Sequence, residues 1–139
     1  MFIDSSVFVA ILASEPDASE FADAIEASRH CQTCGIARLE TVMTVSTKLD
    51  VAPAEVDVAF DRLLEERGIG VVAITDAIAR EAVAAFAQYG KGRGHPARLN
   101  LGDCLIYASA KAHREPLLFK GADFARTDIK PALRSKSGG

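Results

Sequence analysis

The chain has 139 residues, of which 49% are hydrophobic and 25% are charged, and its net charge is −3. This length fits one domain with a sizeable core, and the apolar content excludes wholesale disorder. No stretch approaches the ~20 apolar residues that a membrane span needs. No leader precedes Asp4, so we expect a cytoplasmic protein with three reduced cysteines.

The charge is divided unevenly along the chain. Residues 1–89 have a balance of −9, and residues 90–139 have a balance of +6. Such an asymmetry indicates a polyanionic partner or an acidic–basic self-association. The alternative is that the two halves of the chain interleave in space, in which case the charge asymmetry along the sequence indicates no partner.

The first predicted strand is Phe2-Ile3, which runs directly into Asp4. Two consecutive apolar residues suit a parallel strand that is buried on both faces. Asp4 then lies where the strand ends and a helix from Ser6 to Ala13 begins. The carboxyl ends of parallel strands are where open α/β sheets bind ligands. Alternatively, Asp4 or Ser5 only caps the helix.

A second helix opens at residues 17–20, and residues 30–34 read as a second strand. Cys31 and Cys34 have the C-x-x-C spacing of redox and zinc sites. Cys104 is the only other cysteine, so a structural role for this pair is favoured.

A long helix is predicted from Ile36 to Leu49. Its apolar stripe is read from the helical spacing of four residues: Ile36, Leu39, Met43 and Leu49. Glu40 projects beside this stripe. A carboxylate there is costly unless it is paired or metal-bound, although a Glu at a helix shoulder with its head in solvent is common.

A helix from Pro53 to Arg67, a strand over residues 71–74 and a helix from Thr75 follow. The core positions expected on these two helices are Val56, Phe60, Leu63, Leu64, Ile78, Ala82, Ala85 and Phe86. Residues 89–98 are rich in glycine and basic residues and lack any period. They predict a long loop, and long loops in compact domains are often functional.

Asn100 is expected to cap a helix from Leu101 to about Arg114. Its predicted buried stripe consists of Leu101, Cys104, Leu105, Ala108 and Ala112. Asp103 lies in the first turn, where an acid also serves as a simple capping residue.

A fourth parallel strand is predicted at residues 116–119, and a short last strand follows Asp128. Asp123 then repeats, after the fourth strand, the placement of Asp4 after the first. The strand–helix alternation predicts a parallel sheet covered on both faces.

Four acids can therefore converge at one edge of the predicted sheet: Asp4, Glu40, Asp103 and Asp123. Such a cluster repels itself and raises its own pKa values, and a divalent cation relieves that repulsion. Oxygen ligands suit Mg²⁺ or Mn²⁺, and the lack of a His/Cys set disfavours zinc. Acid clusters of this kind usually serve phosphoryl chemistry, in which metals activate water.

The nearby cations provide candidates for holding a phosphate backbone. The first three are Lys91, Arg93 and Arg98 in the loop. Further candidates are Arg114, Lys120 and Arg126, with Lys111, Lys130 and Arg134 as reserves. The alternative is that all of them are solvated surface charges.

At this point the chain resembles the PIN-domain ribonucleases, and more narrowly the VapC-type toxins of bacterial toxin–antitoxin pairs. The resemblance covers nearly the whole chain. It rests on Ile3-Asp4-Ser5-Ser6, on Ala37-Arg38-Leu39-Glu40, on the segment from Leu99 to Ala108, and on the segment from Leu118 to Ile129.

The resemblance implies a three-layer α/β/α fold around a central parallel sheet, with one nuclease domain over residues 1–134 and a polar tail over residues 135–139. It implies Mg²⁺- or Mn²⁺-dependent endonucleolysis of RNA, inhibition by a cognate antitoxin, and a homodimer. The family's metal ligands and catalytic acids map onto the four acids named above. Ser6 matches a supporting hydroxyl, and Asp128 could support or replace Asp123.

Two other functions stay open from the residues alone. A phosphatase or phosphoacceptor domain could use Asp4 as nucleophile, although such families want further acids beside the first one, and here Ser5 and Ser6 follow. A non-catalytic interaction module could keep the fold, although intact acids at all four positions speak against it.

Overall fold

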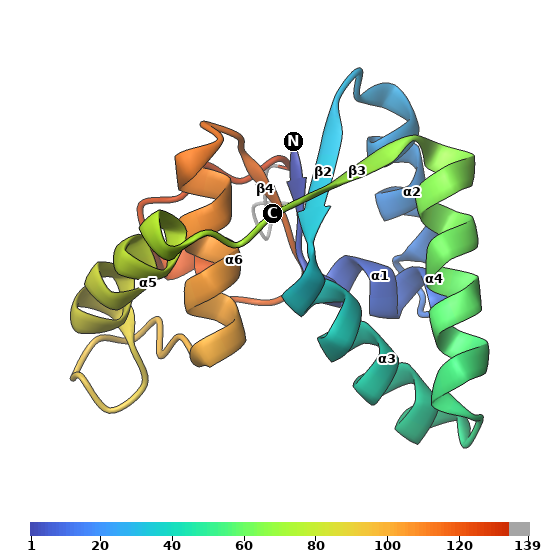
Figure 1. Ribbon diagram of the computed structural model, residues 1–139, viewed down its shortest axis with the longest axis horizontal. Coiled ribbons are helices and arrows are strands. Elements are labelled where there is room, and N and C mark those ends of the chain that lie inside the picture. Colours follow the sequence, from blue (N-terminus) through green and yellow to red (C-terminus); the bar gives the residue numbers. More distant parts are fainter. Residues whose placement is uncertain (134–139) are drawn as a thin grey trace, which may run out of the picture.

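The computed structural model describes residues 1–133 and contains a four-stranded parallel sheet in the order β3-β2-β1-β4. The strands are β1 (Phe2–Ile3), β2 (Cys31–Cys34), β3 (Ile69–Val72) and β4 (Leu117–Leu118). The helices are α1 (Ser5–Leu12), α2 (Ala18–Ala27), α3 (Gly35–Leu49), α4 (Pro53–Arg67), α5 (Asp76–Tyr89), α6 (Leu101–Ala112) and the 3₁₀ turn η1 (Phe124–Arg126). In Figure 1, α5 and α6 lie on one side of the sheet and α1, α2 and α4 on the other. The predicted three-layer α/β/α fold is therefore confirmed.

The carboxyl edge of the sheet is where the predicted acids gather. β1 is central and pairs with β4 through Phe2↔Leu117 and Ile3↔Leu118, and the Asp4 backbone N–H continues this pairing to Leu118 O at 3.0 Å. Because the strands are parallel, their carboxyl ends lie together. α1 and α3 start at this edge, and the first turn of α6 reaches the same edge (Figure 1).

The third strand lies two residues earlier than predicted, at Ile69–Val72 and not at residues 71–74. Gly68 adopts a left-handed conformation with φ of 63° and ends α4 abruptly, so the chain turns into the sheet at once. Gly70 lies inside the strand, paired with Gln32. A strand over residues 71–74 leaves Gly70 outside the sheet, but β3 is an edge strand, and an edge strand tolerates a glycine.

Up to residue 133, where the described part of the chain ends, the short last strand predicted after Asp128 is not formed. The structure has η1 and, beyond it, a single parallel bridge between Leu117 and Pro131, while Ile129 is buried against the core. Pro131 lacks an N–H donor and cannot extend a ladder. The predicted tail over residues 135–139, and the reserve cation Arg134, lie outside the described residues.

Of the four residues of the predicted apolar stripe of α3, Ile36 packs against the core and the other three do not. Leu39, Met43 and Leu49 are exposed, Met43 at 60%, and the buried positions are Ala37, Thr41 and Val45. Smaller side chains on this face let α3 approach α1, α4 and α6 closely. Thr41 can be buried because its hydroxyl donates to Ala37 O at 2.6 Å.

Three expected core positions on α5 and α6 are also wrong. Phe86 is 45% exposed and Leu101 is 74% exposed. α6 lies between α5, α3 and the sheet, so from Gly102 onward most of its circumference is buried. Ala112, at its far end, is exposed as well.

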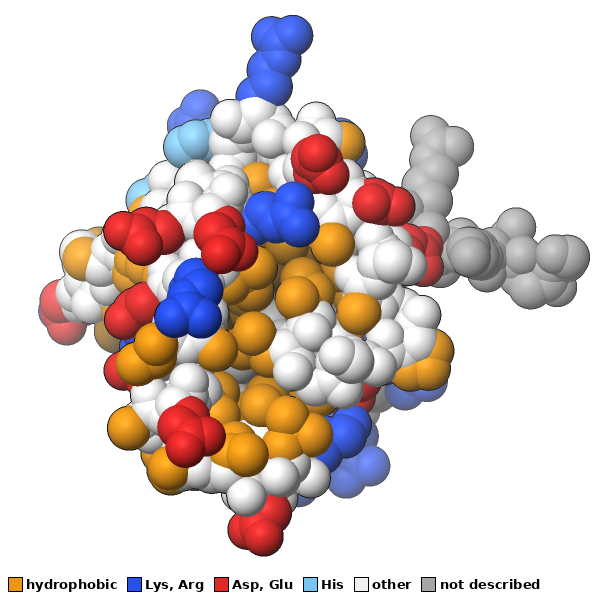
Figure 2. Space-filling view, turned by 90° about the vertical axis from the view of Figure 1, so that its right-hand side faces the viewer, with side chains coloured by type: hydrophobic (Ala, Val, Ile, Leu, Met, Phe, Trp, Pro, Cys, Tyr) orange, Lys and Arg blue, Asp and Glu red, His pale blue; other side chains and the backbone are white. Residues whose placement is uncertain are grey.

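The opposite side of the molecule is shown in Figure 2, which faces α2 and α4. Hydrophobic side chains form a hollowed band in the middle of this face, and acidic and basic side chains surround it (Figure 2). Leu12 and Leu64, from α1 and α4, are half-buried hydrophobic residues that pack against the core. Within the described residues no helix is long and apolar enough to cross a membrane.

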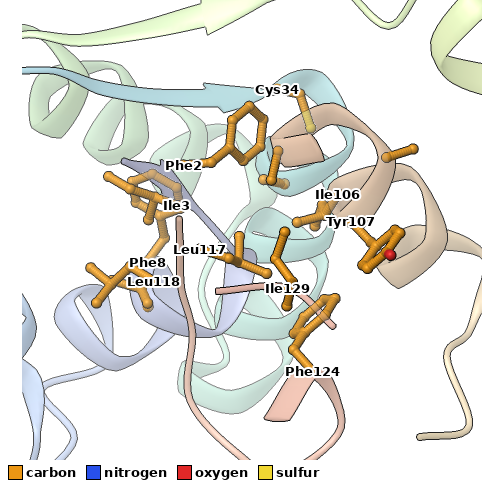
Figure 3. Close-up of a cluster of buried hydrophobic side chains, with 14 of the residues drawn as sticks. Phe2, Ile3, Phe8, Cys34, Ile106, Tyr107, Leu117, Leu118, Phe124 and Ile129 are labelled. Carbon is orange, nitrogen blue, oxygen red and sulfur yellow. The ribbon is translucent and has the colours of Figure 1, made fainter. Parts of the chain in front are cut away.

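The core lies on both faces of the short central strands. Figure 3 shows Leu118 beside Ile3 and Phe8, and Leu117 beside Ile129 and Ile106. Neighbouring residues of a strand point to opposite faces of the sheet. Two consecutive apolar residues in β1 and in β4 therefore contribute one side chain to the core on each face. This packing fixes the carboxyl end of β1, and with it Asp4, in the middle of the fold.

Candidate active site

Asp4 lies at the end of β1 and is also the N-cap of α1. Its Oδ2 accepts hydrogen bonds from Ser6 N at 3.1 Å and from Ser6 Oγ at 2.5 Å. The side chain is buried, and Oδ1 has no hydrogen-bond partner. Burial raises the pKa of Asp4, and the Ser6 hydrogen bonds oppose that rise. Asp4 therefore does cap α1, as the alternative expected, but capping does not explain the buried Oδ1.

Ser6 joins the first strand to the chain that follows the fourth. Its hydroxyl donates to Asp4 and accepts from the Lys120 backbone N–H at 2.9 Å. Because Lys120 follows β4, this hydrogen bond ties the Asp123 segment to the carboxyl end of β1. The supporting position expected for Ser6 has a structural basis in this bridge.

Glu40 lies on the second turn of α3 and faces the same edge. Its Oε1 accepts from Ser5 Oγ at 3.1 Å. Burial raises the pKa of Glu40 to about 7, and the charges of Asp4 and Asp103 add to this rise. Glu40 therefore belongs to the acid cluster and is not a helix-shoulder residue with its head in solvent.

Asp103 has two roles in the first turn of α6. It forms a capping box with Asn100, in which Asp103 N donates to Asn100 Oδ1 at 2.9 Å and Asn100 N donates to Asp103 Oδ2 at 3.1 Å. Burial raises the pKa of Asp103 to about 6, and the charges of Asp4 and Asp123 contribute. The capping box accounts for the hydrogen bonds of Asp103 with Asn100, and the nearby charges of Asp4 and Asp123 show that Asp103 also lies in the acid cluster.

Asp123 follows β4 and lines a cavity of about 320 Å³ together with Asp103. The remaining lining residues are Lys91, Arg98 and Asn100. Two of the three predicted RNA-binding cations thus lie beside two of the predicted acids. The third, Arg93, does not line this cavity, and its guanidinium lies 5.8 Å from the centre of the Phe86 ring.

Known proteins resemble this chain over nearly its whole length. The PIN domain matches residues 1–130. Ribonuclease VapC28 of Mycobacterium tuberculosis is 41% identical over 133 residues, which cover 96% of this chain and 98% of that protein. Ribonuclease VapC42 of the same species is 42% identical over 132 residues, with 95% and 98% covered.

The chain belongs to the PIN-domain family.

Solved PIN-domain toxins share the fold. Mycobacterium tuberculosis VapC20, described as a sarcin-ricin loop cleaving toxin, superposes with a TM-score of 0.74 at 14% identity and covers 96% of this chain and 98% of its own. A toxin–antitoxin complex from Klebsiella pneumoniae has a TM-score of 0.64 at 20% identity, with 89% of each chain covered. At these identities the likeness concerns the fold alone.

Asp128, the suggested substitute for Asp123, is held elsewhere in this PIN domain. It accepts from the Tyr107 hydroxyl and from Lys111 Nζ, the latter at 3.0 Å. The Tyr107 hydrogen bond is the main cause that lowers the pKa of Asp128. Sequence reasoning assigned no role to Tyr107; its place one turn after Asp103 on α6 was the available signal.

Several other predicted cations are engaged with protein groups. Lys120 Nζ forms ion pairs with Glu15 at 3.2 Å and Asp17 at 3.1 Å. Arg126 donates to Pro96 O at 3.1 Å. Lys91 and Arg98 are therefore the better-placed candidates for holding a phosphate near the acids.

The acids fit a divalent cation in their chemistry, although they do not form a preassembled cage. In residues 1–133 no three His, Cys, Asp or Glu side chains form a group that could hold a metal ion. The donor set is nevertheless all oxygen, three of its pKa values are raised, and Asp4 Oδ1 is buried without a partner. A buried anionic oxygen without a donor is costly, and a cation would satisfy it.

The raised pKa values predict the pH dependence of the metal-free protein. The pKa of Glu40 rises from 4.5 to about 7 and that of Asp103 from 3.8 to about 6. Folding is therefore disfavoured by these groups at high pH. This cost begins to shrink as the pH falls through about 7 and 6, and it is gone only below the ordinary values of 4.5 and 3.8. Urea unfolding in EDTA should show a larger free energy of unfolding at about pH 5.5 than at about pH 8.

Glu40→Gln is the control for that experiment, because it removes one titrating group and keeps the shape. The gain in stability on acidification should be smaller in this variant. The lowered pKa values of Glu15 and Asp128 act in the opposite direction, but only below their ordinary values of 4.5 and 3.8. Equal stability of the wild-type protein at the two pH values would contradict the electrostatic description of the site.

Proposed function

We propose that this protein is a divalent-metal-dependent endoribonuclease and the toxin of a toxin–antitoxin pair. The observation that carries the proposal is the convergence of Asp4, Glu40 and Asp103 at the carboxyl edge of the sheet, where burial raises all three pKa values and the charge of Asp4 adds to the rise for Glu40 and Asp103. Its full-length relatives at 41–42% identity are named ribonucleases. A phosphoacceptor domain or a non-catalytic module is not favoured by these relatives.

The proposed ligands for Mg²⁺ or Mn²⁺ are Asp4, Glu40, Asp103 and Asp123. Such an ion, when bound, activates water and stabilises the leaving oxygen of an in-line phosphodiester displacement. The protein's own contribution is to hold the acids at the ends of packed elements. Asp4 is fixed by Ser6, Glu40 by Ser5, and Asp103 by Asn100. The same four acids are the proposed catalytic residues.

RNA cleavage with and without chelator tests the proposal directly. Purified protein should cut tRNA or rRNA in Mn²⁺, leave 5′-phosphate ends, and lose this activity in excess EDTA. Activity should return when Mn²⁺ is added back, and Asp4→Asn protein purified in the same way excludes a contaminating nuclease. RNA turnover at full rate in EDTA would refute metal dependence.

Substrate holding is assigned to the cations beside the acids. Since the acids themselves repel a phosphate backbone, Lys91 and Arg98 supply the opposite charge in the cavity that Asp103 and Asp123 line. The loop that carries them is closed at its base, where Lys91 N donates to Leu99 O at 2.8 Å. Arg93 is expected to contribute from the exposed part of the same loop.

Charge reversal of Lys91, Arg93 and Arg98 should weaken RNA binding in general and reduce its salt dependence. Each lost phosphate contact should lower the slope of log K against log[salt] by about 0.7 for single-stranded RNA. Binding is measured by fluorescence anisotropy on the Asp4→Asn background, so that no RNA is cut. Reversal of Arg29, exposed after α2, and of Arg62, exposed on α4, is the control for added negative charge away from the acids. An unchanged slope in the triple variant would assign RNA holding to other cations.

The proposed protein partner is a cognate antitoxin that blocks the site. The fold neighbour from Klebsiella pneumoniae is described as a toxin–antitoxin complex, and the hollowed apolar band on the α2 and α4 side offers a surface for an amphipathic segment (Figure 2). Co-expression with the antitoxin should abolish RNA cleavage. We also place the protein in the cytoplasm, consistent with three free, buried cysteines.

The proposed homodimer uses a different surface. A hollow of about 500 Å³ between α5 and α6 is lined almost entirely by apolar residues, among them Val83, Phe86, Leu101 and Leu105. Three of these are exposed large hydrophobic residues, and such grouped exposure marks protein contacts. Light scattering of the purified protein should give twice the chain mass of 14.8 kDa, and a monomer at micromolar concentration would contradict the dimer.

A further inference from the structure

The backbone conformation at Gly102 does not require a glycine. Gly102 is the second residue of α6 and is buried. The glycines with positive φ in the described part of the chain are Gly68, Gly92, Gly94 and Gly121, so Gly102 is not among those that need left-handed freedom. In a helix, alanine is intrinsically favoured over glycine. The glycine must therefore be explained by its surroundings.

The side chain nearest to the missing Cβ of Gly102 is the Glu40 carboxylate. A Cβ built on Gly102 would lie 2.7 Å from Glu40 Cδ and 3.0 Å from Glu40 Oε1, and still closer to Oε2. Real Cβ atoms do not approach heavy atoms below 3.0 Å. Any side chain at this position would therefore push the carboxylate away from the first turn of α6.

Glu40 is held from the other side by a hydroxyl. Ser5 Oγ, at the start of α1, donates to Glu40 Oε1 at 3.1 Å. The carboxylate thus lies between the first turn of α1 and the first turn of α6, next to Asp4 and Asp103, whose charges both raise its pKa. A helix N-terminus is a favourable place for a carboxylate, and the bare Cα of Gly102 permits this approach.

We propose that Gly102 is a positioning residue for Glu40: the space left by its missing side chain holds the Glu40 carboxylate beside Asp103. The proposal rests on the proposed nuclease function and deepens it. It explains why a buried helical position carries the residue that helices favour least after proline. It also predicts that a single methyl group at residue 102 disturbs the metal site while every proposed ligand residue stays unchanged.

Gly102→Ala should weaken Mn²⁺ binding by roughly 10- to 100-fold, the usual effect of disturbing a residue that supports a metal ligand. Calorimetric titration of the full chain with Mn²⁺ measures this. RNA cleavage should fall through kcat with little change in KM, because Lys91 and Arg98 still hold the substrate. Gly35→Ala is the matched control: it makes the same change in the first turn of α3, where nothing lies within 4 Å of the new Cβ.

A folding experiment tests the contact without any metal or RNA. The shift in Tm caused by Gly102→Ala in EDTA is compared in the wild-type protein and on a Glu40→Ala background. Once the Glu40 carboxylate is gone, the three closest contacts of the added methyl group are removed, and the helix-favouring effect of alanine should emerge. The substitution should therefore be more stabilising, or less destabilising, on the Glu40→Ala background.

The two experiments separate the inference from the function on which it rests. If the wild-type protein fails to cut RNA but Gly102→Ala and Glu40→Ala remain coupled in Tm, the function is wrong and the positioning contact stands. Equal Tm shifts on both backgrounds, or wild-type Mn²⁺ affinity in Gly102→Ala, would overturn the positioning role. Loss of Mn²⁺ affinity in Gly35→Ala as well would also overturn it, because the effect would then not depend on the Glu40 contact.

Discussion

Asp4→Asn should lower the rate of RNA cleavage roughly a thousandfold, or by about 4 kcal/mol of transition-state stabilisation. The asparagine keeps the shape of the side chain, and its amide oxygen can still accept the Ser6 hydrogen bonds made by Oδ2. It replaces the unpartnered Oδ1 with an uncharged group. The change therefore removes the anionic charge that faces the proposed metal and little else. Single-turnover cleavage of a labelled RNA in saturating Mn²⁺ measures the loss.

The same substitution should leave the metal-free fold at least as stable as the wild-type protein. Burial raises the pKa of Asp4, which means that the charged form is disfavoured in the folded state at neutral pH. Urea unfolding at about pH 8 should show this gain, and the gain should shrink on acidification. Asp76→Asn is the control, since Asp76 also starts a helix but is exposed and paired with Arg80. A stable Asp4→Asn protein with full activity would remove Asp4 from the site.

Asp103→Asn should also lower cleavage roughly a thousandfold, with a small effect on the stability of α6. An asparagine oxygen can still accept from Asn100 N, as Asp103 Oδ2 does at 3.1 Å, and the backbone N–H of residue 103 still donates to Asn100 Oδ1, so both hydrogen bonds of the capping box survive. What disappears is the charge beside Asp4 and Asp123. Cleavage rates and thermal unfolding of the same preparation separate the two roles.

Asn100→Ala gives the opposite pattern and serves as the comparison. It removes the N-cap oxygen that accepts from Asp103 N at 2.9 Å, which should cost about 1 kcal/mol of stability. The carboxylate of Asp103 keeps its charge, so cleavage per folded molecule should fall far less than in Asp103→Asn. If Asp103→Asn were active and merely less stable, Asp103 would be a capping residue only.

The sequence predicted the elements well where local patterns decide them. Phe2-Ile3 followed by Asp4 predicted a buried strand with an acid at its carboxyl end, and β1 has this arrangement. Asn100 before an apolar period predicted the start of α6, because capping is a local interaction between residues three positions apart. The order of these elements was also enough to expect a parallel sheet with the acids on one edge.

Helix faces could not be predicted in the same way. Leu39 and Met43 have helical spacing, yet α3 turns Ala37, Thr41 and Val45 inward. Periodicity reports that a helix has an apolar face, whereas the distance to its neighbours decides which face is buried. Close approach to three other helices selected the small residues and left the larger ones exposed.

The grouping of the charged side chains was likewise a property of the tertiary structure. The sequence determined which residues carry charge: four acids spread over 120 positions and a basic loop from Lys91 to Arg98. Only the fold decided that Lys91 and Arg98 line one cavity with Asp103 and Asp123, that Lys120 is paired with Glu15 and Asp17, and that Asp128 turns to Tyr107.

Gly102 shows the same division within one motif. The sequence places a glycine beside Asp103, and nothing local explains it, since the helical backbone there accepts any residue. The reason lies 62 positions earlier in the chain, where Glu40 on α3 extends to the first turn of α6. Local chemistry determined the elements and their caps, because those interactions span a few residues. Packing between distant segments decided the site, because a carboxylate's neighbours in space depend on how whole helices meet.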